Sequence, residues 1–246
     1  NTGKTLITLY LVTQAILEKR IDPSMLVYID MDDNSSGLVE KARIAQEFGF
    51  QIVADGYHGF QAKTFWKAIS QMVETNTARG HVIILDTLKK FVNTMEKRES
   101  SEFAKLVRQF VMKGGTVVAL AHVNKRPGAN GKPVYGGTSD ILDDFDCGYT
   151  IDTIDENPYT YEKVVEFENI KRRGNVPLSA CYVFSTEAGI CYNELLLSVR
   201  EIASDAVDSL KKELVLVSDS MVIAAIAACI REGTNTKMLL AEAAAE

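Results

Sequence analysis

The chain opens on a motif whose residue types suit phosphate binding. Asn1-Thr2-Gly3-Lys4-Thr5 fits the second half of G-x-x-x-x-G-K-[ST], and a helical pattern begins directly after it. Backbone N–H groups of a glycine-rich turn at a helix N-terminus bind phosphate oxygens. We therefore expect these five residues to hold ATP, with Lys4 at the β- and γ-phosphates and the Thr5 hydroxyl on Mg²⁺.

A short apolar run further along supplies a candidate partner carboxylate. The run from His81 to Leu85 reads HVIIL, which is typical of a buried strand, and Asp86 ends it. A carboxylate at that place orients Mg²⁺ or one of its waters. The alternative is an ordinary strand whose last residue caps a helix. With G-K-T upstream we favour the metal role for Thr5 and Asp86, and expect ATP and Mg²⁺ as cofactors.

Five short segments, taken in order, resemble one known family. They are N-T-G-K-T at the start, Y-I-D-M-D-D from Tyr28, H-V-I-I-L-D from His81, V-A-L-A-H-V-N-K from Val118 and E-N-I-K-R-R-G-N from Glu168. Together they resemble the RecA-like P-loop ATPases, and within them the hexameric replicative and plasmid replication helicases. The resemblance spans Asn1 to Ser185 and implies ATP hydrolysis by a homo-oligomer, expected to be a hexamer.

The resemblance also assigns roles in hydrolysis to Asp32 and His122. In these ATPases a glutamate after the strand that follows the first helix activates the attacking water, and Asp32 stands at that place. Asp is one methylene shorter, and Asp33 and Asp30 remain alternatives. Members of this family also carry a Gln or His after a later strand, where it senses the γ-phosphate. His122 stands at that place, and its imidazole can donate a hydrogen bond to a phosphate oxygen. A lone His at a strand end is also often structural.

Two basic features are similar to parts of these helicases. Lys171 and Arg173 match a K-x-R element that reaches the neighbouring subunit's γ-phosphate, and alternate residues of an extended segment share a side. A basic turn before Gly174 is the alternative. Two loops of this chain also correspond to loops that line the central channel of these helicases. Lys and Arg side chains there would neutralise the phosphates of single-stranded DNA. The expected DNA-binding residues are Lys89, Lys90, Lys125, Arg126 and Lys132. Solvated loops are the alternative.

Apolar runs alternate with helical patterns through the first half of the chain. Strands are expected at 25–29, 51–54, 81–85 and 116–121, with helices at 6–19, 36–48, 63–75 and 102–113. This order predicts an α/β fold with a mainly parallel central sheet flanked by helices. Further strands at 146–152, 164–170 and 181–185 follow with little helix between them, and suggest antiparallel additions at one edge.

The chain is expected to form two domains. Residues 1–193 would be the RecA-like ATPase domain, without its first strand and the start of its P-loop, since both ends of the chain are interpreted as truncated. Residues 194–246 would form two or three helices, either an incomplete helix-turn-helix or winged helix or a bundle for subunit contacts.

The bulk properties limit the partners. The net charge is −6, so nucleic acid binding would depend on local basic loops rather than on the whole surface. None of the four cysteines lies in a C-x-x-C pair. We therefore interpret them as small core residues of a protein in a reducing cytoplasm, rather than as a zinc site or a redox motif. The apolar stretch from Met221 to Ile230 is too short to span a bilayer, so no membrane partner is expected.

The sequence thus predicts a motor that hydrolyses ATP and acts on single-stranded DNA, a replicative helicase of plasmid, phage or mobile-element type. Two alternatives remain open. One is an ATPase that forms recombination or repair filaments. The other is a regulatory nucleotide-binding switch with little hydrolysis, which Asp in place of Glu at position 32 slightly favours.

Overall fold

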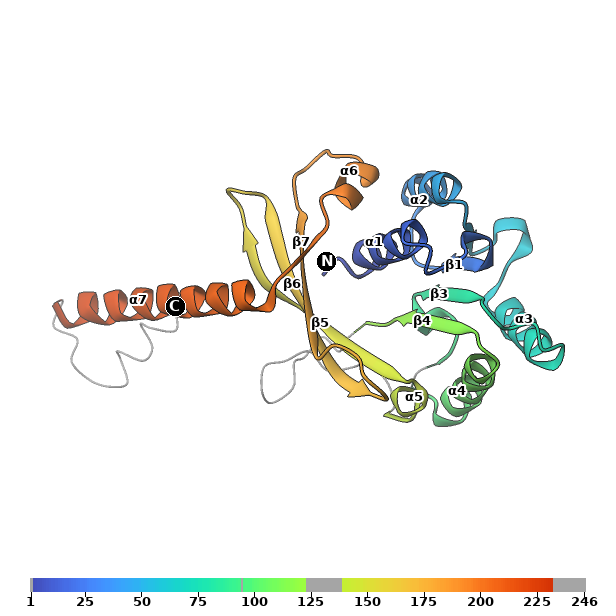
Figure 1. Cartoon of the computed structure of the whole chain (residues 1–246). Helices are drawn as coiled ribbons and strands as arrows, with labels where there is room; N and C mark the ends of the chain where they lie inside the picture. The colour runs from blue at the N-terminus through green and yellow to red at the C-terminus, as the bar shows by residue number, and fades with distance from the viewer. Residues whose placement is uncertain (1, 94, 123–138, 232–246) are drawn as a thin grey trace. The chain divides into compact units, whose positions relative to one another are not determined.

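A computed structural model of the chain describes residues 2–93, 95–122 and 139–231 (Figure 1). The chain divides into two units, Asn1–Glu201 and Ile202–Glu246. The described residues form two four-stranded sheets, with strand orders β2-β1-β3-β4 and β5-β6-β7-β8.

The first sheet is parallel throughout and confirms the predicted central sheet. Its strands are β1 (Leu26–Asp30), β2 (Gln51–Ala54), β3 (Val82–Asp86) and β4 (Thr116–Leu120). The register pairs Asp30 with both Ala54 and Asp86, and Asp86 with Leu120. The carboxyl ends of all four strands therefore lie along one edge, where ligands bind in open parallel sheets.

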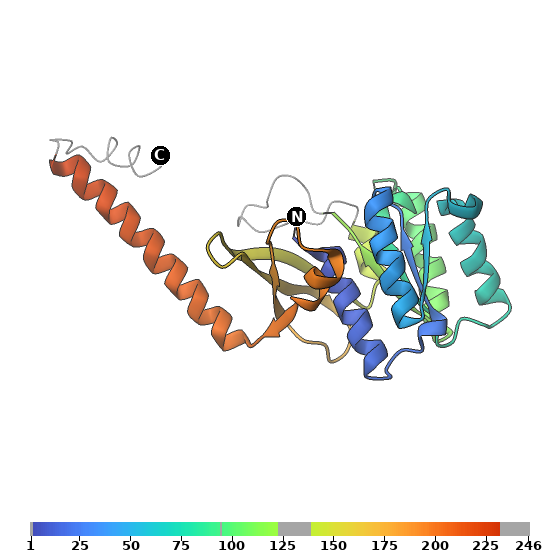
Figure 2. The same ribbon diagram turned by 90° about the horizontal axis from the view of Figure 1, so that it is seen from above.

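Helices cover both faces of this sheet, as the α/β expectation requires (Figure 2). On one face α1 (Lys4–Leu17) and α2 (Ser35–Phe48) share a core with Tyr28 and Ile84. On the other face α3 (Ala62–Glu74) and α4 (Lys97–Met112) pack Phe65, Phe103 and Phe110 against the strands. The two cores are separate because the sheet lies between them and its strands direct alternate side chains to opposite faces.

The later strands form a sheet of their own rather than additions to the edge of the parallel sheet. Its strands are β5 (Cys147–Asn157), β6 (Glu162–Arg172), β7 (Ser179–Ser185) and β8 (Arg200–Ile202), with α6 (Tyr192–Leu197) before β8. β5, β6 and β7 pair antiparallel. Val165, Tyr182 and Phe184 from this sheet join the core that contains α1, so α1 is buried by both sheets.

The second unit contains one described helix, α7 (Ser204–Arg231). It runs for 28 residues, and β8 precedes it in the region where helices alone were expected. Residues 232–246 of that region lie outside the described residues, so the expected number of helices stays a prediction. Val215, Leu216, Met221 and Ile223 are exposed on it. Among the described residues, Asp205–Arg231 is also the one stretch long and apolar enough to cross a membrane by length and composition alone. The apolar run at 221–230, which was judged too short to span a bilayer, is only part of this longer helix.

Candidate active site

Gly3 shapes the start of α1, where the phosphate-binding motif was predicted. Its φ of 72° lies in the left-handed region, and its carbonyl accepts the first helical hydrogen bond, from the N–H of Ile7 at 2.9 Å. A Cβ on Gly3 would lie 2.7 Å from the Phe184 ring of β7. Both the backbone conformation and this close approach require glycine. Lys4 and Thr5 then form the first turn of α1, and Asn1 lies outside the described residues.

Thr5 and Asp86 meet, as the two motifs predicted. The Thr5 hydroxyl donates to Asp86 Oδ2 at 2.7 Å, from the start of α1 to the end of β3. Asp86 is 7% exposed. Hydroxyl and carboxylate oxygens are the hard ligands that Mg²⁺ prefers, and Mg²⁺ commonly takes only one or two protein ligands beside substrate phosphates. The pair therefore fits the predicted metal role.

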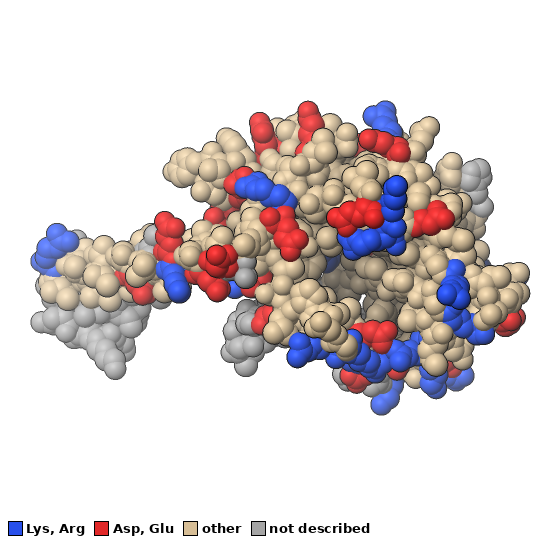
Figure 3. Space-filling view, in the orientation of Figure 1, with Lys and Arg blue, Asp and Glu red and all other residues tan. Residues whose placement is uncertain are grey.

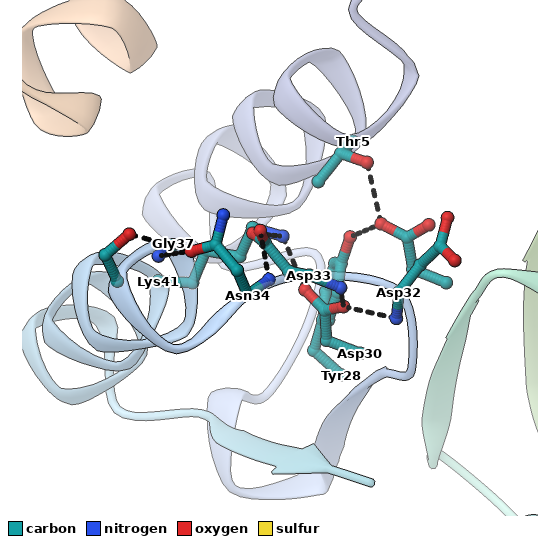
Figure 4. A network of polar contacts seen from close by, with 10 residues as sticks. Thr5, Tyr28, Asp30, Asp32, Asp33, Asn34, Gly37 and Lys41 are labelled. Atoms are coloured by element: carbon teal, nitrogen blue, oxygen red, sulfur yellow. Dashed lines mark hydrogen bonds and ion pairs between the residues drawn. The ribbon is translucent and has the colours of Figure 1, made fainter.

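Tyr28 is a site residue that no motif predicted. Its hydroxyl donates to the same Asp86 Oδ2 at 2.8 Å, from the middle of β1 (Figure 4). Burial, and then the charge of Asp86, raises the pKa of Tyr28 well above its usual value, so the phenol stays a donor. The available signal was a tyrosine within an aliphatic strand, because a buried tyrosine hydroxyl needs a partner.

Asp32 lies in the turn after β1, beside basic side chains that follow β3 and β4. Asp32 Oδ2 is 3.6 Å from His122 Nε2, and Oδ1 is 3.9 Å from Lys89 Nζ. His122 follows β4, and Lys89 belongs to the short helix Leu88–Lys90 after β3. All three side chains are 40–53% exposed. The structure thus places Lys89, predicted to bind DNA, next to the predicted catalytic carboxylate.

The two alternative carboxylates lie differently from Asp32. Asp30, the last residue of β1, is 2% exposed and pairs with the Lys41 ammonium. Asp33 pairs with the same ammonium at 2.7 Å. Figure 4 shows Asp30, Asp33 and Lys41 directed toward one another, with Asp32 on the other side of the turn. Asp32 is therefore the carboxylate of the three that is placed to contact a water.

Lys171 and Arg173 are held at the carboxyl end of the short helix α5 (Ser139–Asp144). Lys171 Nζ donates to the carbonyl oxygens of Leu142 and Asp143, and Arg173 donates to the Asp143 carbonyl at 2.7 Å. Cations favour the negative end of a helix. Arg108 then donates to Asp146 Oδ1 at 2.5 Å, and the same oxygen lies 3.6 Å from Arg173.

Of the remaining predicted DNA-binding residues, the structure describes only Lys90. Lys90 lines an open hollow of about 630 Å³ together with Lys89, Lys63 and Trp66. Lys125, Arg126 and Lys132 lie outside the described residues. Lys and Arg side chains gather along the lower edge of Figure 3, near α4 and α5, with acidic side chains among them.

These elements define a RecA-like α/β fold, with a helix-starting G-K-T and a strand-ending carboxylate in contact. Solved structures agree. One solved ATPase domain is similar with a TM-score of 0.51 and 12% identity over 75% of this chain and 78% of that one. A DnaB-like replicative helicase, solved with its interactions with primase, gives a TM-score of 0.52 and 13% identity.

These likenesses show the fold that the sequence resemblance predicted. The match to the DnaB-like helicase covers 76% of this chain but spans only 54% of the helicase chain. No protein-family model matches the chain. No curated protein matches it by sequence.

Proposed function

We propose that the chain is an ATP-hydrolysing motor of replicative-helicase type that acts on single-stranded DNA. The observation that carries the proposal is that candidate metal ligands, a candidate base and a candidate phosphate sensor lie together at one edge of the parallel sheet. Thr5 and Asp86 provide oxygen ligands 2.7 Å apart, and Asp32 stands exposed beside His122. This arrangement fits phosphoryl transfer to water, in which positioning and charge stabilisation do most of the work.

Each residue then has a role set by its place. Lys4, in the first turn of α1, binds the β- and γ-phosphates, while Thr5 and Asp86 hold Mg²⁺. When bound, Mg²⁺ neutralises charge on the phosphate oxygens. Asp32 accepts a hydrogen bond from the attacking water, because its carboxylate is exposed and ionisable at the strand end. His122, which follows β4, would reach the γ-phosphate and lies 3.6 Å from Asp32.

The DNA and assembly parts of the proposal rest on the fold neighbours and on the basic residues. One of the similar structures is that of a DnaB-like replicative helicase. Lys90, with Lys125, Arg126 and Lys132, would bind the phosphates of a single strand. In a ring, Lys171 and Arg173 would act on the γ-phosphate of the adjacent subunit.

ATP turnover of the full-length natural protein, with and without single-stranded DNA and at rising protein concentration, tests this function. We expect stimulation by DNA and a specific activity that rises steeply with concentration. Tight ATP binding without turnover would instead indicate a nucleotide switch. Filaments rather than rings in electron micrographs would indicate a recombination protein.

A variant of Asp32 tests the site itself. Asp32→Asn should lower kcat by about 10²- to 10⁴-fold, the usual contribution of a positioned base, and leave ATP affinity within threefold. Asp55 follows β2 at the same edge of the sheet and is exposed, so Asp55→Asn is the matched control and should retain activity. Equal losses in the two variants would contradict the assignment.

A further inference from the structure

A lysine is buried behind the turn that carries Asp32. Lys41 on α2 is 3% exposed, and its ammonium contacts Asp30 Oδ2 and, at 2.7 Å, Asp33 Oδ2. Burial alone would lower the pKa of Lys41, but the hydrogen bonds to Asp30 and Asp33 outweigh that effect and raise it. The group therefore stays charged. A buried ion pair is weak evidence for stability, because desolvation offsets its attraction, so its geometric effect is of more interest.

The second oxygen of Asp30 holds the turn. Asp30 Oδ1 accepts hydrogen bonds from the backbone N–H groups of Asp32 at 3.2 Å and Asp33 at 3.1 Å. One carboxylate thus links the Lys41 ammonium to the main chain on both sides of the Asp32 side chain.

The network continues into the start of α2. Asp33 Oδ1 accepts from the N–H of Asn34 at 2.7 Å, and the Asn34 side chain accepts from the N–H of Gly37 at 3.0 Å as the N-cap of α2. The turn between β1 and α2 is therefore fixed at both ends. Within it the Asp32 side chain remains 40% exposed, directed to His122 and Lys89.

We propose that Lys41 and Asp30 are positioning residues that set the Asp32 carboxylate at the distance from the γ-phosphate that water activation needs. Neither touches ATP. Because Asp is one methylene shorter than Glu, its reach depends closely on where the main chain of the turn lies. The inference rests on the proposed ATPase function. A displacement of about 1 Å in a reacting group can cost about 10²-fold in rate.

Two matched double variants separate positioning from general damage. Asp30→Ala with Lys41→Met removes the buried charges and also the acceptor for the turn. Asp30→Asn with Lys41→Met removes the same charges but keeps an oxygen that can accept from the Asp32 and Asp33 amides. Neither variant leaves Asp30 or Lys41 as a buried unpaired charge, which would be the main threat to folding. Asp33, whose side chain is 26% exposed, loses its ion pair equally in both variants, so the comparison between them is unaffected.

The proposal predicts that the alanine variant loses at least about tenfold in kcat with ATP affinity within threefold, and that the asparagine variant recovers most of that loss. Equal kcat values in the two variants would overturn it. So would a loss of ATP affinity that parallels the loss of kcat, since general damage to the site produces that pattern.

Hydrogen exchange of the Asp32 and Asp33 amides provides a readout that needs no turnover. Protection of both amides should fall in the alanine variant and persist in the asparagine variant. Unchanged protection in the alanine variant would overturn the positioning role even in an active enzyme. An inactive parent protein would instead contradict the proposed function, while the exchange result still decides whether Asp30 holds the turn.

Discussion

At the scale of single residues, Asp86 is the group around which the candidate site is organised. Thr5 and Tyr28 both donate to its Oδ2, one from α1 and the other from β1. Hydrogen bonds to an ionised acceptor are stronger than neutral ones. Tyr28 therefore fixes the carboxylate from the adjacent strand β1, while Thr5 contacts it from the start of α1.

Tyr28 should make stability sensitive to alkaline pH. Its pKa lies well above 10 in the folded protein, because burial and the Asp86 charge disfavour the phenolate, but near 10 in the unfolded chain. Below about pH 10 the Tyr28 phenol is protonated in both the folded and the unfolded state, so it does not change the free energy of unfolding with pH. Above it the unfolded state releases a proton that the folded state keeps, so the free energy of unfolding falls by about 1.4 kcal/mol per pH unit.

Urea denaturation between pH 9 and pH 11, at half-unit steps, checks this prediction. Tyr28→Phe should make the decline shallower by about that slope. Tyr159→Phe is the control, because the Tyr159 side chain is 89% exposed and has similar surroundings in both states. A decline of the same steepness in all three proteins would show that other groups cause it.

The sequence predicted those site residues that a short motif specifies. Thr5 and Asp86 come from a helix-starting G-K-T and a strand-ending carboxylate, and both occupy the expected places. Lys41 was missed because it lies in Glu40-Lys41-Ala42-Arg43, which is typical of a solvated helix face. Its burial depends on Asp30 and Asp33 meeting it across the turn, and only the tertiary structure shows that.

At the scale of elements, α2 begins where the network around Asp33 ends. Asn34 caps the helix, and Gly37 lies in its first turn beside the Asp33 carboxylate. A Cβ at Gly37 would overlap with that carboxylate. The carboxylate cannot move away freely, because Lys41 and the Asn34 N–H both hold it.

Gly37→Ala should therefore destabilise the protein, although the same change in an open helix stabilises by about 0.5–1 kcal/mol. We expect a loss of about 1–3 kcal/mol in the free energy of unfolding, as for overpacked sites. Chemical denaturation measures it, with Ser35→Ala in the same exposed turn as the control. A gain in stability on Gly37→Ala would mean that the carboxylate is free to move.

The predicted elements were most accurate where apolar runs are short and bounded. The strands expected at 25–29, 51–54, 81–85 and 116–121 agree with β1 to β4 within a residue or so. β5 and β6 extend further than predicted, because the residues that they add, 153–157, 162–163 and 171–172, are mostly polar or charged and form no apolar run. The two strands continue to the turn near Tyr161, whose φ is 53°. β8 has three residues and too little pattern to detect.

At the scale of the whole molecule, the proposed ring would make each ATP site depend on two subunits. Lys171 and Arg173 bind the carboxyl end of α5 within their own subunit. Their role at a neighbour's γ-phosphate therefore requires them to exchange these carbonyl contacts for phosphate oxygens. Arg108 shares Asp146 with Arg173, and this offers a way to separate the two roles.

Subunit mixing tests the action in trans. Lys4→Ala would remove the proposed phosphate contact in a subunit's own site but leave its Arg173, whereas Arg173→Ala would do the reverse. Each variant alone should be nearly inactive. An equal mixture should recover up to about a quarter of wild-type ATP turnover, since half of the sites are intact and half of those adjoin an intact Arg173.

Arg108→Ala is the control for the local contact. It removes a partner of Asp146 from the same cluster, so it reproduces any disturbance of that contact without removing Arg173, the arginine proposed to act in trans. It should remain active alone. If Arg108→Ala is as inactive as Arg173→Ala, the arginine matters for its own subunit's structure. If the Lys4→Ala and Arg173→Ala mixture recovers nothing while mixed oligomers form, the site is complete within one subunit, and the basic pair serves only to hold α5 against β6.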